Sequence, residues 1–489
     1  MDRLVREKLS FLFVIKYGII RLKGLSNMKI YNTLSHQVEE FIPYEEGKVK
    51  MYTCGPTVYN YAHIGNLRTY IFEDILEKTL RYLGYEVLRC MNITDVGHLT
   101  SDSDSGEDKM VKGAKKENKT VLEIAKFYTD AFKKDTEKLN IKWPQIVSPA
   151  TENISVYFKI IERLLEKDLA YISGGNVYFD TSKLDDYYQL TNHRPDEMVV
   201  GVREGVEEDN NKRNQADFVL WFTKSKFDSQ ELKWESPWGV GYPGWHIECS
   251  GIAISNLGEY LDIHCGAVDN IFPHHTNEIA QSEGYLGHKW CKYWIHGEHL
   301  NDTSGKMSKS KGGFLTVSLL EEKGYDPLAY RYLCLTSHYR KQLTFSFEIL
   351  DNAMQSYQKL KSRIQSLEKT GSVDQQVFEE YDQKFKEYLG DDLNVANALT
   401  LVYDLLKSNV NDVTKYSLIK NWDQVFSLNL TLEKQLEPEF EEYILRKIEE
   451  RARAKENKNY VLADQIREEL LQKNVVLKDT REGTTYSLL

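Results

Sequence analysis

The chain has 489 residues, of which 41% are hydrophobic and 28% are charged, and it carries a net charge of −11. This length predicts about three domains, and the ordinary composition excludes disordered and fibrous proteins. The acidic balance excludes a general binder of polyanions, so any contact with nucleic acid must use a local basic surface. No run approaches the ~20 apolar residues of a membrane span, so no membrane association is expected. The six scattered cysteines, none in a CxxC pair, are too few for a disulfide framework and predict a cytoplasmic enzyme.

The first 27 residues differ from the rest of the chain. Leu9–Ile20 is mostly apolar but is interrupted by Lys16, and the 27 residues hold six basic and two acidic side chains. No A-x-A-like cleavage site follows. We therefore favour a start at Met28 or a dispensable leader over an export signal or an amphipathic helix with its own role.

Strand-like and helix-like runs alternate from Lys48 to about Asp326, which predicts an α/β fold built on a parallel sheet. Val49–Cys54 is typical of a buried strand, Asn66–Leu83 of a helix with one apolar face, and Glu86–Ile93 of a second strand. The expected later features are a surface loop at Asp102–Lys119, helices to about Lys167, a short strand at Asn176–Asp180 and a polar excursion at Asp196–Gln215.

Beyond Phe345 the periodicity is helical with little strand signal, which predicts a helical bundle. The expected helical spans are Phe347–Leu367, Gln376–Leu389, Asn394–Val410 and Pro438–Lys473.

Two short segments carry the strongest chemical signal. Cys54–Asn66 (CGPTVYNYAHIGN) lies between the first predicted strand and helix, at the edge where parallel sheets bind ligands. Its Gly65 lets a nucleotide approach the backbone, and the helix N-terminus favours phosphate oxygens. Lys306–Gly312 (KMSKSKG) places three lysines within six positions, where they can meet a triphosphate as mobile charges. Taken singly, each segment is more simply explained as an ordinary loop or a solvated basic loop.

Together, in this order and about 240 residues apart, the two segments resemble the HIGH and KMSKS signatures of class I aminoacyl-tRNA synthetases. Attack of a carboxylate on the α-phosphate of ATP needs positioning and positive charge where pyrophosphate departs. The resemblance implies that His63 and Asn66 contact the phosphates, next to the ATP-binding Gly65. It also implies that Lys306 and Lys309 stabilise the departing pyrophosphate and that Mg²⁺ accompanies ATP. Asn66 stands where the family has histidine, and an amide can still donate a hydrogen bond.

A third signal comes from two segments with metal-ligand residues, GWHIECS at 244–250 and FPHHTNE at 272–278. His274 and Glu278 are four residues apart, so a helix beginning at Pro273 would set both on one face. With Cys249 they make a plausible zinc set, but spacing alone does not choose the fourth ligand. A cytosolic cysteine beside a His-His pair that caps a helix explains the same residues.

The segments CGPTVYN, MNITDVGH, ADFVLW, GWHIECS and PHHTNE, in this order around the two signatures, look like the cysteinyl-tRNA synthetases. The resemblance covers Met28–Leu489 and implies a Rossmann-like catalytic domain at 28–345, with an inserted connective region at about 140–240, after a leader at 1–27 of doubtful role. A helical, anticodon-binding region at 346–489 would follow. The resemblance also implies one zinc ion per chain and a cysteine substrate near three further residues. The family's zinc ligands match Cys54, Cys249, His274 and Glu278, and its cysteine-contacting residues match Gly55, Thr94 and Trp245.

Zinc suits this substrate because cysteine has a sulfur atom where serine has an oxygen atom. A pocket that discriminates by shape alone rejects such a near-isostere only weakly. A soft, thiolate-ligated zinc prefers a thiolate to a hydroxyl. One departure concerns DIHCGAVD at 262–269, where the family often has adjacent glycines. We expect Cys265 and Ala267 to add side chains near the adenine site and to alter its packing without abolishing binding, and we leave Cys265 out of the metal set.

The expected activity is a two-step ligation of L-cysteine to tRNA(Cys) by way of cysteinyl-adenylate, in a monomeric chain. A basic cluster that suits tRNA lies on one C-terminal helical stretch, although solvated helix surface explains it equally well. A cysteine ligase with an amine acceptor and a non-catalytic tRNA-binding paralogue remain the alternatives. The basic cluster comprises Arg446, Lys447, Arg451, Arg453, Lys455 and Lys458.

Overall fold

The computed structural model describes residues 27–96, 120–191, 209–224, 231–302, 305–306, 315–432, 438–473, 475–480 and 483–488. The leader at 1–26, the loop predicted at Asp102–Lys119, part of the excursion predicted at Asp196–Gln215 and Lys309 lie outside these ranges. No helix within the described ranges is long and apolar enough to cross a membrane.

A five-stranded sheet with the order β11-β10-β3-β4-β5 forms the centre of the molecule, and every neighbouring pair in it is parallel. The predicted α/β class is therefore confirmed. Its strands are β3 (Lys48–Thr53), β4 (Glu86–Ile93), β5 (Ile146–Pro149), β10 (Leu261–Ala267) and β11 (Cys291–Gly297).

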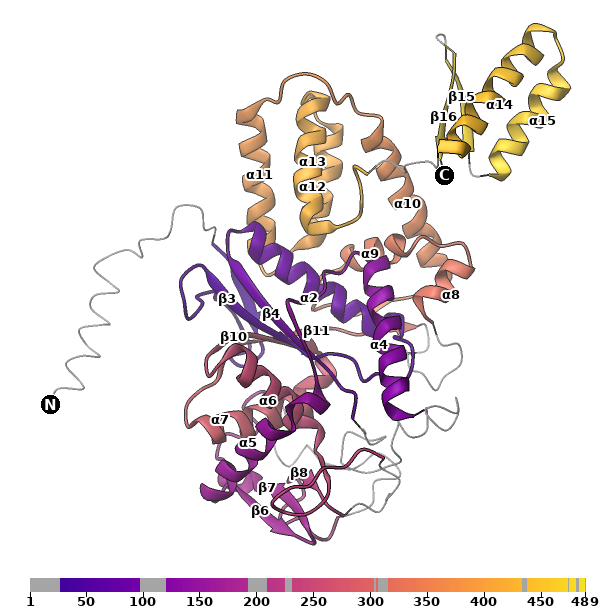
Figure 1. The fold of residues 1–489 in the computed structure, drawn as a ribbon. Coiled ribbons are helices and arrows are strands. Elements are labelled where there is room, and N and C mark those ends of the chain that lie inside the picture. The colour runs from indigo at the N-terminus through magenta and orange to yellow at the C-terminus, as the bar shows by residue number, and fades with distance from the viewer. Residues whose placement is uncertain are drawn as a thin grey trace.

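Helices cover both faces of this sheet (Figure 1). Helix α2 (Ile64–Tyr82) lies on one face, and α6 (Trp245–Leu257) lies on the other together with α5 (Ile154–Glu166) and α7 (Thr276–Leu286). Below α5–α7, a separate antiparallel sheet has the order β6-β7-β8-β9, and its first three strands fall within the range predicted for the insertion. Its strands are β6 (Ala170–Ser173), β7 (Asn176–Phe179), β8 (Phe218–Phe222) and β9 (Tyr242–Pro243).

Smaller elements surround the central sheet. The hairpin β1 (Lys29–Asn32) and β2 (Gln37–Glu40) precedes it, and α4 (Val121–Lys138) begins at a capping box of Thr120 and Glu123. The remaining elements before the bundle are the short strands β12 (Leu300–Asp302), β13 (Gly305–Lys306) and β14 (Leu343–Thr344), and the helices α8 (Val317–Glu322) and α9 (Pro327–Leu335).

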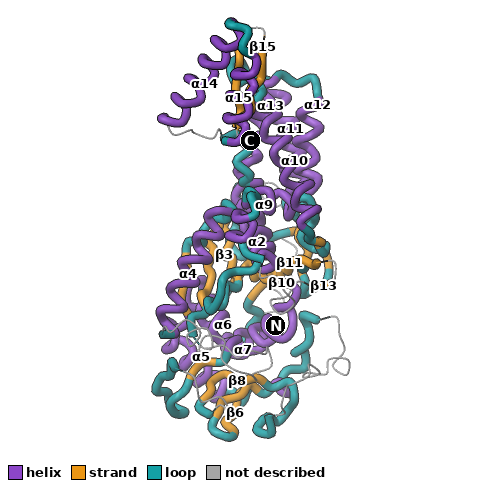
Figure 2. Tube along the Cα trace, turned by 90° about the vertical axis from the view of Figure 1, so that its right-hand side faces the viewer, coloured by secondary structure: helices purple, strands orange, loops and turns teal. Residues whose placement is uncertain are grey.

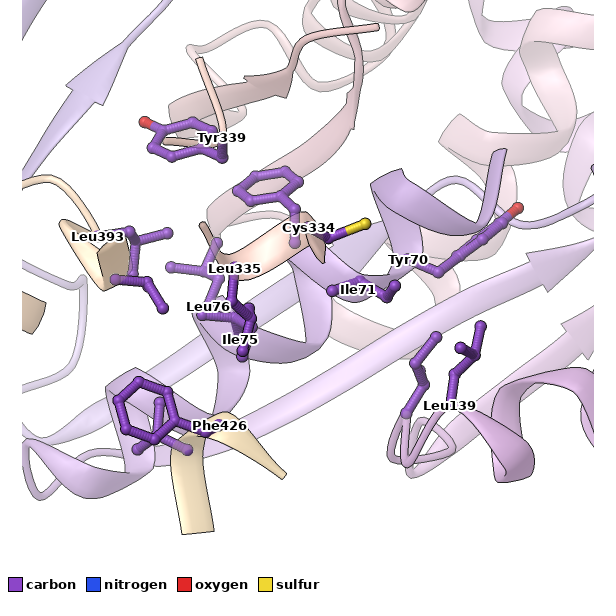
Figure 3. Close-up of a cluster of buried hydrophobic side chains, with 14 of the residues drawn as sticks. Tyr70, Ile71, Ile75, Leu76, Leu139, Cys334, Leu335, Tyr339, Leu393 and Phe426 are labelled. Carbon is purple, nitrogen blue, oxygen red and sulfur yellow. The ribbon is translucent and has the colours of Figure 1, made fainter. Parts of the chain in front are cut away.

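The C-terminal bundle packs against α2 and α9 through the largest hydrophobic core. Figure 3 shows Ile71 and Ile75 of α2 in this core with Leu335 of α9 and Phe426 of the bundle. A buried ion pair joins α9 to α2, because the Arg331 guanidinium lies 2.7 Å from the Asp74 carboxylate, and Arg331 Nε also donates to the Phe426 carbonyl of the bundle at 2.7 Å. The bundle helices are α10 (Phe347–Gln365), α11 (Gln375–Gly390), α12 (Val395–Lys407) and α13 (Asp412–Phe426).

Beyond the bundle lies a small unit with its own hydrophobic core, at one end of the elongated molecule in Figure 2. Its helices are α14 (Pro438–Glu456) and α15 (Tyr460–Gln472), so the helical character predicted for Pro438–Lys473 is confirmed, with a break between two helices. The break follows from Lys458, which has φ of 54°, and from Asn459, whose side chain caps α15. The chain then ends in an antiparallel hairpin, β15 (Val475–Thr480) with β16 (Gly483–Leu488), where the sequence predicted only helix.

The basic cluster on α14 is partly neutralised within this unit. Arg451 and Lys455 both contact Asp479 of β15, at 2.7 and 2.8 Å, and Lys447 lies 3.0 Å from Glu469. These contacts favour helix surface as the explanation for three of the six residues.

Candidate active site

The first motif loop leaves the carboxyl end of β3 and turns directly against β4. At Gly55 a Cβ atom would lie 1.7 Å from the carbonyl oxygen of Asn92, so only glycine fits this approach. The Gly55 N–H donates to Asn92 Oδ1 at 2.7 Å, which fixes the loop on the sheet edge. The loop therefore presents Cys54 where ligands of parallel sheets bind.

His63 and Asn66 lie at the start of α2, as the sequence predicted. His63 is the N-cap, and its Nδ1 accepts from the Gly65 N–H at 3.0 Å. Asn66 is exposed on the first turn. The positive end of the helix dipole and the first-turn amide groups make this terminus suitable for an anion.

The second motif begins close to the first. Lys306 is in β13, which pairs with β12, and a Cβ atom at Gly65 would lie 3.9 Å from Leu300 of β12. The backbone at Lys306 is thus paired with β12, which lies beside the N-terminus of α2. Lys309 lies beyond the described residues.

The side chains of Cys54, Cys249, His274 and Glu278 converge, and their ligand atoms all lie within 4.8 Å of one another. Cys54 Sγ is 3.9 Å from both Cys249 Sγ and Glu278 Oε1, and His274 Nε2 is 3.0 Å from Glu278 Oε1. Tetrahedral ligands at ordinary Zn–S, Zn–N and Zn–O distances lie roughly 3.3–3.8 Å apart. The four residues therefore fit a zinc ion in both chemistry and spacing.

The route by which His274 and Glu278 meet differs from the prediction. The residues from Ile271 to His275 form an irregular turn with Phe272 in an extended conformation, and α7 begins only at Thr276. Because this turn leads directly into α7, the side chains of His274 and Glu278 still lie on the same side of the chain and contact each other.

A second group shares two of these residues. Cys54 and Glu278 also lie within 4.8 Å of ligand atoms of His264 and His275. His275 Nε2 is 3.3 Å from Cys54 Sγ, so the residue that the resemblance placed outside the metal set lies directly beside it. The two sets differ in whether Cys249 and His274, or His264 and His275, complete the tetrahedron.

The electrostatics of the cluster suit a bound cation. Burial alone would raise the pKa of Cys249, but the hydrogen bond with Cys54 and the adjacent His274 outweigh it and lower the pKa to about 6. Burial likewise opposes ionisation of Glu278, yet His264 and His274 lower its pKa to about 2. An ionised thiolate and an ionised carboxylate at one buried point attract a cation.

Further buried histidines support the cluster, and sequence reasoning did not single out His246, His264 or His296. His246 Nδ1 lies 2.9 Å from His274 Nδ1, and His264 Nε2 lies 2.9 Å from Glu278 Oε2. His296 links His275 to the Thr33 hydroxyl, at 2.8 Å on each side. Such outer contacts fix the orientation of metal ligands. The available signal was their position in strand-like segments, because His264 lies in the middle of β10 and His296 near the carboxyl end of β11.

The three residues predicted to contact cysteine border this cluster. Gly55 follows Cys54, and the half-buried Trp245 begins α6 with its ring centroid 4.4 Å from that of His274. Thr94 Oγ1 donates to Glu248 Oε2 at 3.0 Å. The cluster and these residues thus bring thiol, imidazole, hydroxyl and aromatic groups together.

The expectation for Cys265 needs correction. Its side chain is fully buried in the main hydrophobic core with Met51 and Ile263, so it does not line an open site. Strand alternation explains this, because His264 on β10 faces the cluster and its neighbour faces α2. Ala267, at the end of β10, is half-buried.

Comparison with known proteins agrees with this geometry. Residues 40–355 match the family described as tRNA synthetases class I (C) catalytic domain. The chain is 46% identical to cysteine–tRNA ligase of Treponema denticola over 95% of this chain and 100% of that protein. It is also 46% identical to the Borreliella burgdorferi enzyme of that name, over 94% and 98%. Mycobacterium tuberculosis methionyl-tRNA synthetase in complex with methionyl-adenylate shares the fold, with a TM-score of 0.53 at 14% identity over 77% of this chain and 89% of that one. The chain belongs to the cysteine–tRNA ligase family.

Proposed function

We propose that this enzyme ligates L-cysteine to tRNA(Cys) with ATP, by way of cysteinyl-adenylate. The observation that carries the proposal is the convergence of Cys54, Cys249, His274 and Glu278 at the carboxyl edge of a parallel sheet, near the N-terminus of α2. A class I synthetase that selects cysteine needs a feature that separates a thiol from the hydroxyl of serine, and a zinc site provides one.

Cys54, Cys249, His274 and Glu278 would hold one zinc ion. When bound, zinc supplies a soft Lewis acid that favours the deprotonated substrate thiol over a hydroxyl. The protein's own residues then orient the substrate, since Gly55, Thr94 and Trp245 surround the place where its backbone must lie. The burial of Cys249, His274 and Glu278 shields the zinc site from water on that side.

In the first step, a carboxylate oxygen of cysteine attacks the α-phosphorus of ATP, and the bond to pyrophosphate breaks. His63, Gly65 and Asn66 at the start of α2 would bind the phosphates, with Mg²⁺ accompanying ATP. Lys306 and Lys309 would stabilise the negative charge that develops on the departing pyrophosphate. In the second step, the 2′-hydroxyl of the terminal adenosine attacks the acyl carbon, loses its proton and displaces AMP. We assign no general base to either step.

The proposal divides the chain into a leader at 1–27, a catalytic domain at 28–345 with an insertion at about 140–240, and a tRNA-binding region at 346–489. The described part of the last region adds a bundle and a small α/β unit to the catalytic fold, which provides extended surface for tRNA. A monomeric state and a cytoplasmic location complete the proposal.

A cysteine ligase with an amine acceptor would form the same adenylate, so the acceptor separates the two functions. With purified tRNA(Cys), ATP and labelled cysteine, we expect acid-precipitable label to accumulate on the tRNA. Periodate-oxidised tRNA, which lacks the terminal vicinal diol, serves as the control and should remain unlabelled. Adenylate formation without labelled tRNA would favour the amine-acceptor ligase, whereas tRNA binding without adenylate would favour the non-catalytic paralogue.

A further inference from the structure

The side chain of Asn92 joins three parts of the site. Asn92 lies at the carboxyl end of β4 and is 1% exposed. Its Oδ1 accepts from the Gly55 N–H at 2.7 Å and from the Tyr52 hydroxyl at 3.2 Å. Its Nδ2 donates to Thr94 Oγ1 at 3.0 Å. The Asn92 amide therefore holds Gly55 and Thr94, which border the cluster, and the core residue Tyr52.

These contacts also set the direction of the hydrogen bonds at Thr94. Because Asn92 donates to Thr94 Oγ1, the hydroxyl proton points to Glu248 Oε2, 3.0 Å away. The Thr94 backbone binds the motif loop as well, since its N–H donates to the Pro56 carbonyl at 3.1 Å and its carbonyl accepts from the Val58 N–H at 3.2 Å. Because its only proton is donated to Glu248, Thr94 Oγ1 can act towards a further group only as a hydrogen-bond acceptor.

The neighbours in sequence tie this arrangement to the sulfur ligands. Gly55 follows Cys54, and Glu248 precedes Cys249. Cys54, Gly55 and Trp245 are half-buried, so a ligand can reach them. The α-ammonium group of an amino acid bound through its sulfur lies only three bonds from that sulfur. It must therefore meet the polar groups beside the two cysteines.

We propose that Asn92 is a positioning residue of the amino-acid subsite, which holds Gly55 and Thr94 so that their oxygen atoms face the α-ammonium group of cysteine. This inference rests on the proposed function and adds to it the residue that sets the amino-group end of the subsite. Asn92 acts through Gly55 and Thr94 and touches no substrate itself.

The test compares two ligands that differ only in the amino group. Isothermal titration of the zinc-loaded full chain measures the binding of L-cysteine and of 3-mercaptopropionate, which keeps the thiol and the carboxylate. Asn92→Ala should weaken cysteine binding by roughly 10- to 100-fold, the range for loss of a hydrogen bond to a charged group. Binding of 3-mercaptopropionate should change by less than about threefold, because it has no ammonium group to lose contact with.

Tyr52→Phe is the matched control. It removes the hydrogen bond from the core residue Tyr52 to the Asn92 side chain and keeps the bonds of Asn92 to Gly55 and Thr94. It should leave both affinities within about threefold of those of the original protein, a difference of about 0.65 kcal/mol. Thr94→Val provides a second test that keeps the shape of the side chain, and it should reproduce the selective loss of cysteine binding even if Asn92→Ala does not fold.

Equal weakening of both ligands by Asn92→Ala or Thr94→Val would overturn the inference, because it would place their effect at the thiol end. Unchanged binding of both ligands in the folded variants would overturn it too, as would a selective loss in Tyr52→Phe. If the unaltered protein binds neither ligand, the proposed function itself fails, and that result is distinct from all of these.

Discussion

Replacing Cys249 by serine is expected to weaken zinc binding by more than about 100-fold, since removal of contacts outside the ligand set already costs 10–100-fold. Serine keeps the shape but presents a hydroxyl, which at neutral pH is a far poorer zinc ligand than a thiolate. The original thiol is already set for this role, because the contact with Cys54 and the adjacent His274 overcome burial and lower its pKa to about 6. Zinc content after dialysis against a chelator, followed by competition with a chromophoric indicator, measures the loss.

Cys265→Ala is the matched control, because it removes a buried thiol on the opposite face of β10 and should retain about one zinc per chain. The same experiment separates the two overlapping ligand groups. If Cys54, His264, His275 and Glu278 held the metal, Cys249→Ser would keep its zinc and His275→Ala would lose it. That result would contradict the ligand set proposed for this enzyme.

Lys309→Ala is expected to slow cysteine-dependent ATP–pyrophosphate exchange by roughly 10²- to 10³-fold, the usual cost of removing one group that stabilises charge in a transition state. The lysine charge matters most when pyrophosphate leaves, so the rate constant should fall more than the affinity for ATP. Initial rates across ATP and cysteine concentrations separate the two effects. Zinc content should stay at about one per chain, because the lysine takes no part in the metal set.

Lys311→Ala tests whether the loss of exchange rate depends on the position of Lys309 or only on the number of positive charges in the loop. It removes the same charge two residues away, and we expect a loss of less than about tenfold because the resemblance gives that residue no contact with pyrophosphate. Similar losses at both positions would mean that the loop acts as a diffuse basic surface. Loss of zinc from Lys309→Ala would contradict the separation of the phosphate site from the metal site.

The sequence predicted those parts of the fold in which local pattern and tertiary position agree. Glu86–Ile93 is predicted correctly as a strand because a short, largely apolar run directly after the helix stop at Gly84 suits burial in a parallel sheet. The spacing of His274 and Glu278 also led to the right pairing, although the helix begins later than predicted. There the distance along the chain was short, so an irregular turn did not separate the two side chains.

The rest of the site depends on contacts that local pattern does not specify. Asn92, His264 and His296 come from three different strands, and they surround one site only because the strands take the order β11-β10-β3-β4. Which side chains share a face follows from register, since neighbours along a strand point to opposite sides. The sequence therefore supplied the residues of DIHCGAVD without revealing that His264 faces the cluster and Cys265 faces the core.

The C-terminal errors have a local cause. The predicted helical span Pro438–Lys473 is rich in helix formers, and its interruption depends on two adjacent residues, Lys458 in the left-handed region and Asn459, which caps α15. The final hairpin is too short for a clear alternating pattern, and it is stabilised by packing of Val475 and Leu477 against α14 and α15. Such tertiary stabilisation outweighs weak intrinsic preference.

Cysteine-dependent ATP–pyrophosphate exchange, run beside serine on protein of known zinc content, tests most directly that a zinc site selects cysteine for adenylation. We predict exchange with cysteine, exchange with serine slower by at least about 10³-fold, and about one zinc per chain. A site built to bind one functional group rejects an analogue that lacks this group by about 10⁴–10⁵-fold in favourable cases. Folded, zinc-loaded protein that supports no exchange with cysteine, or that activates serine equally well, would contradict this account.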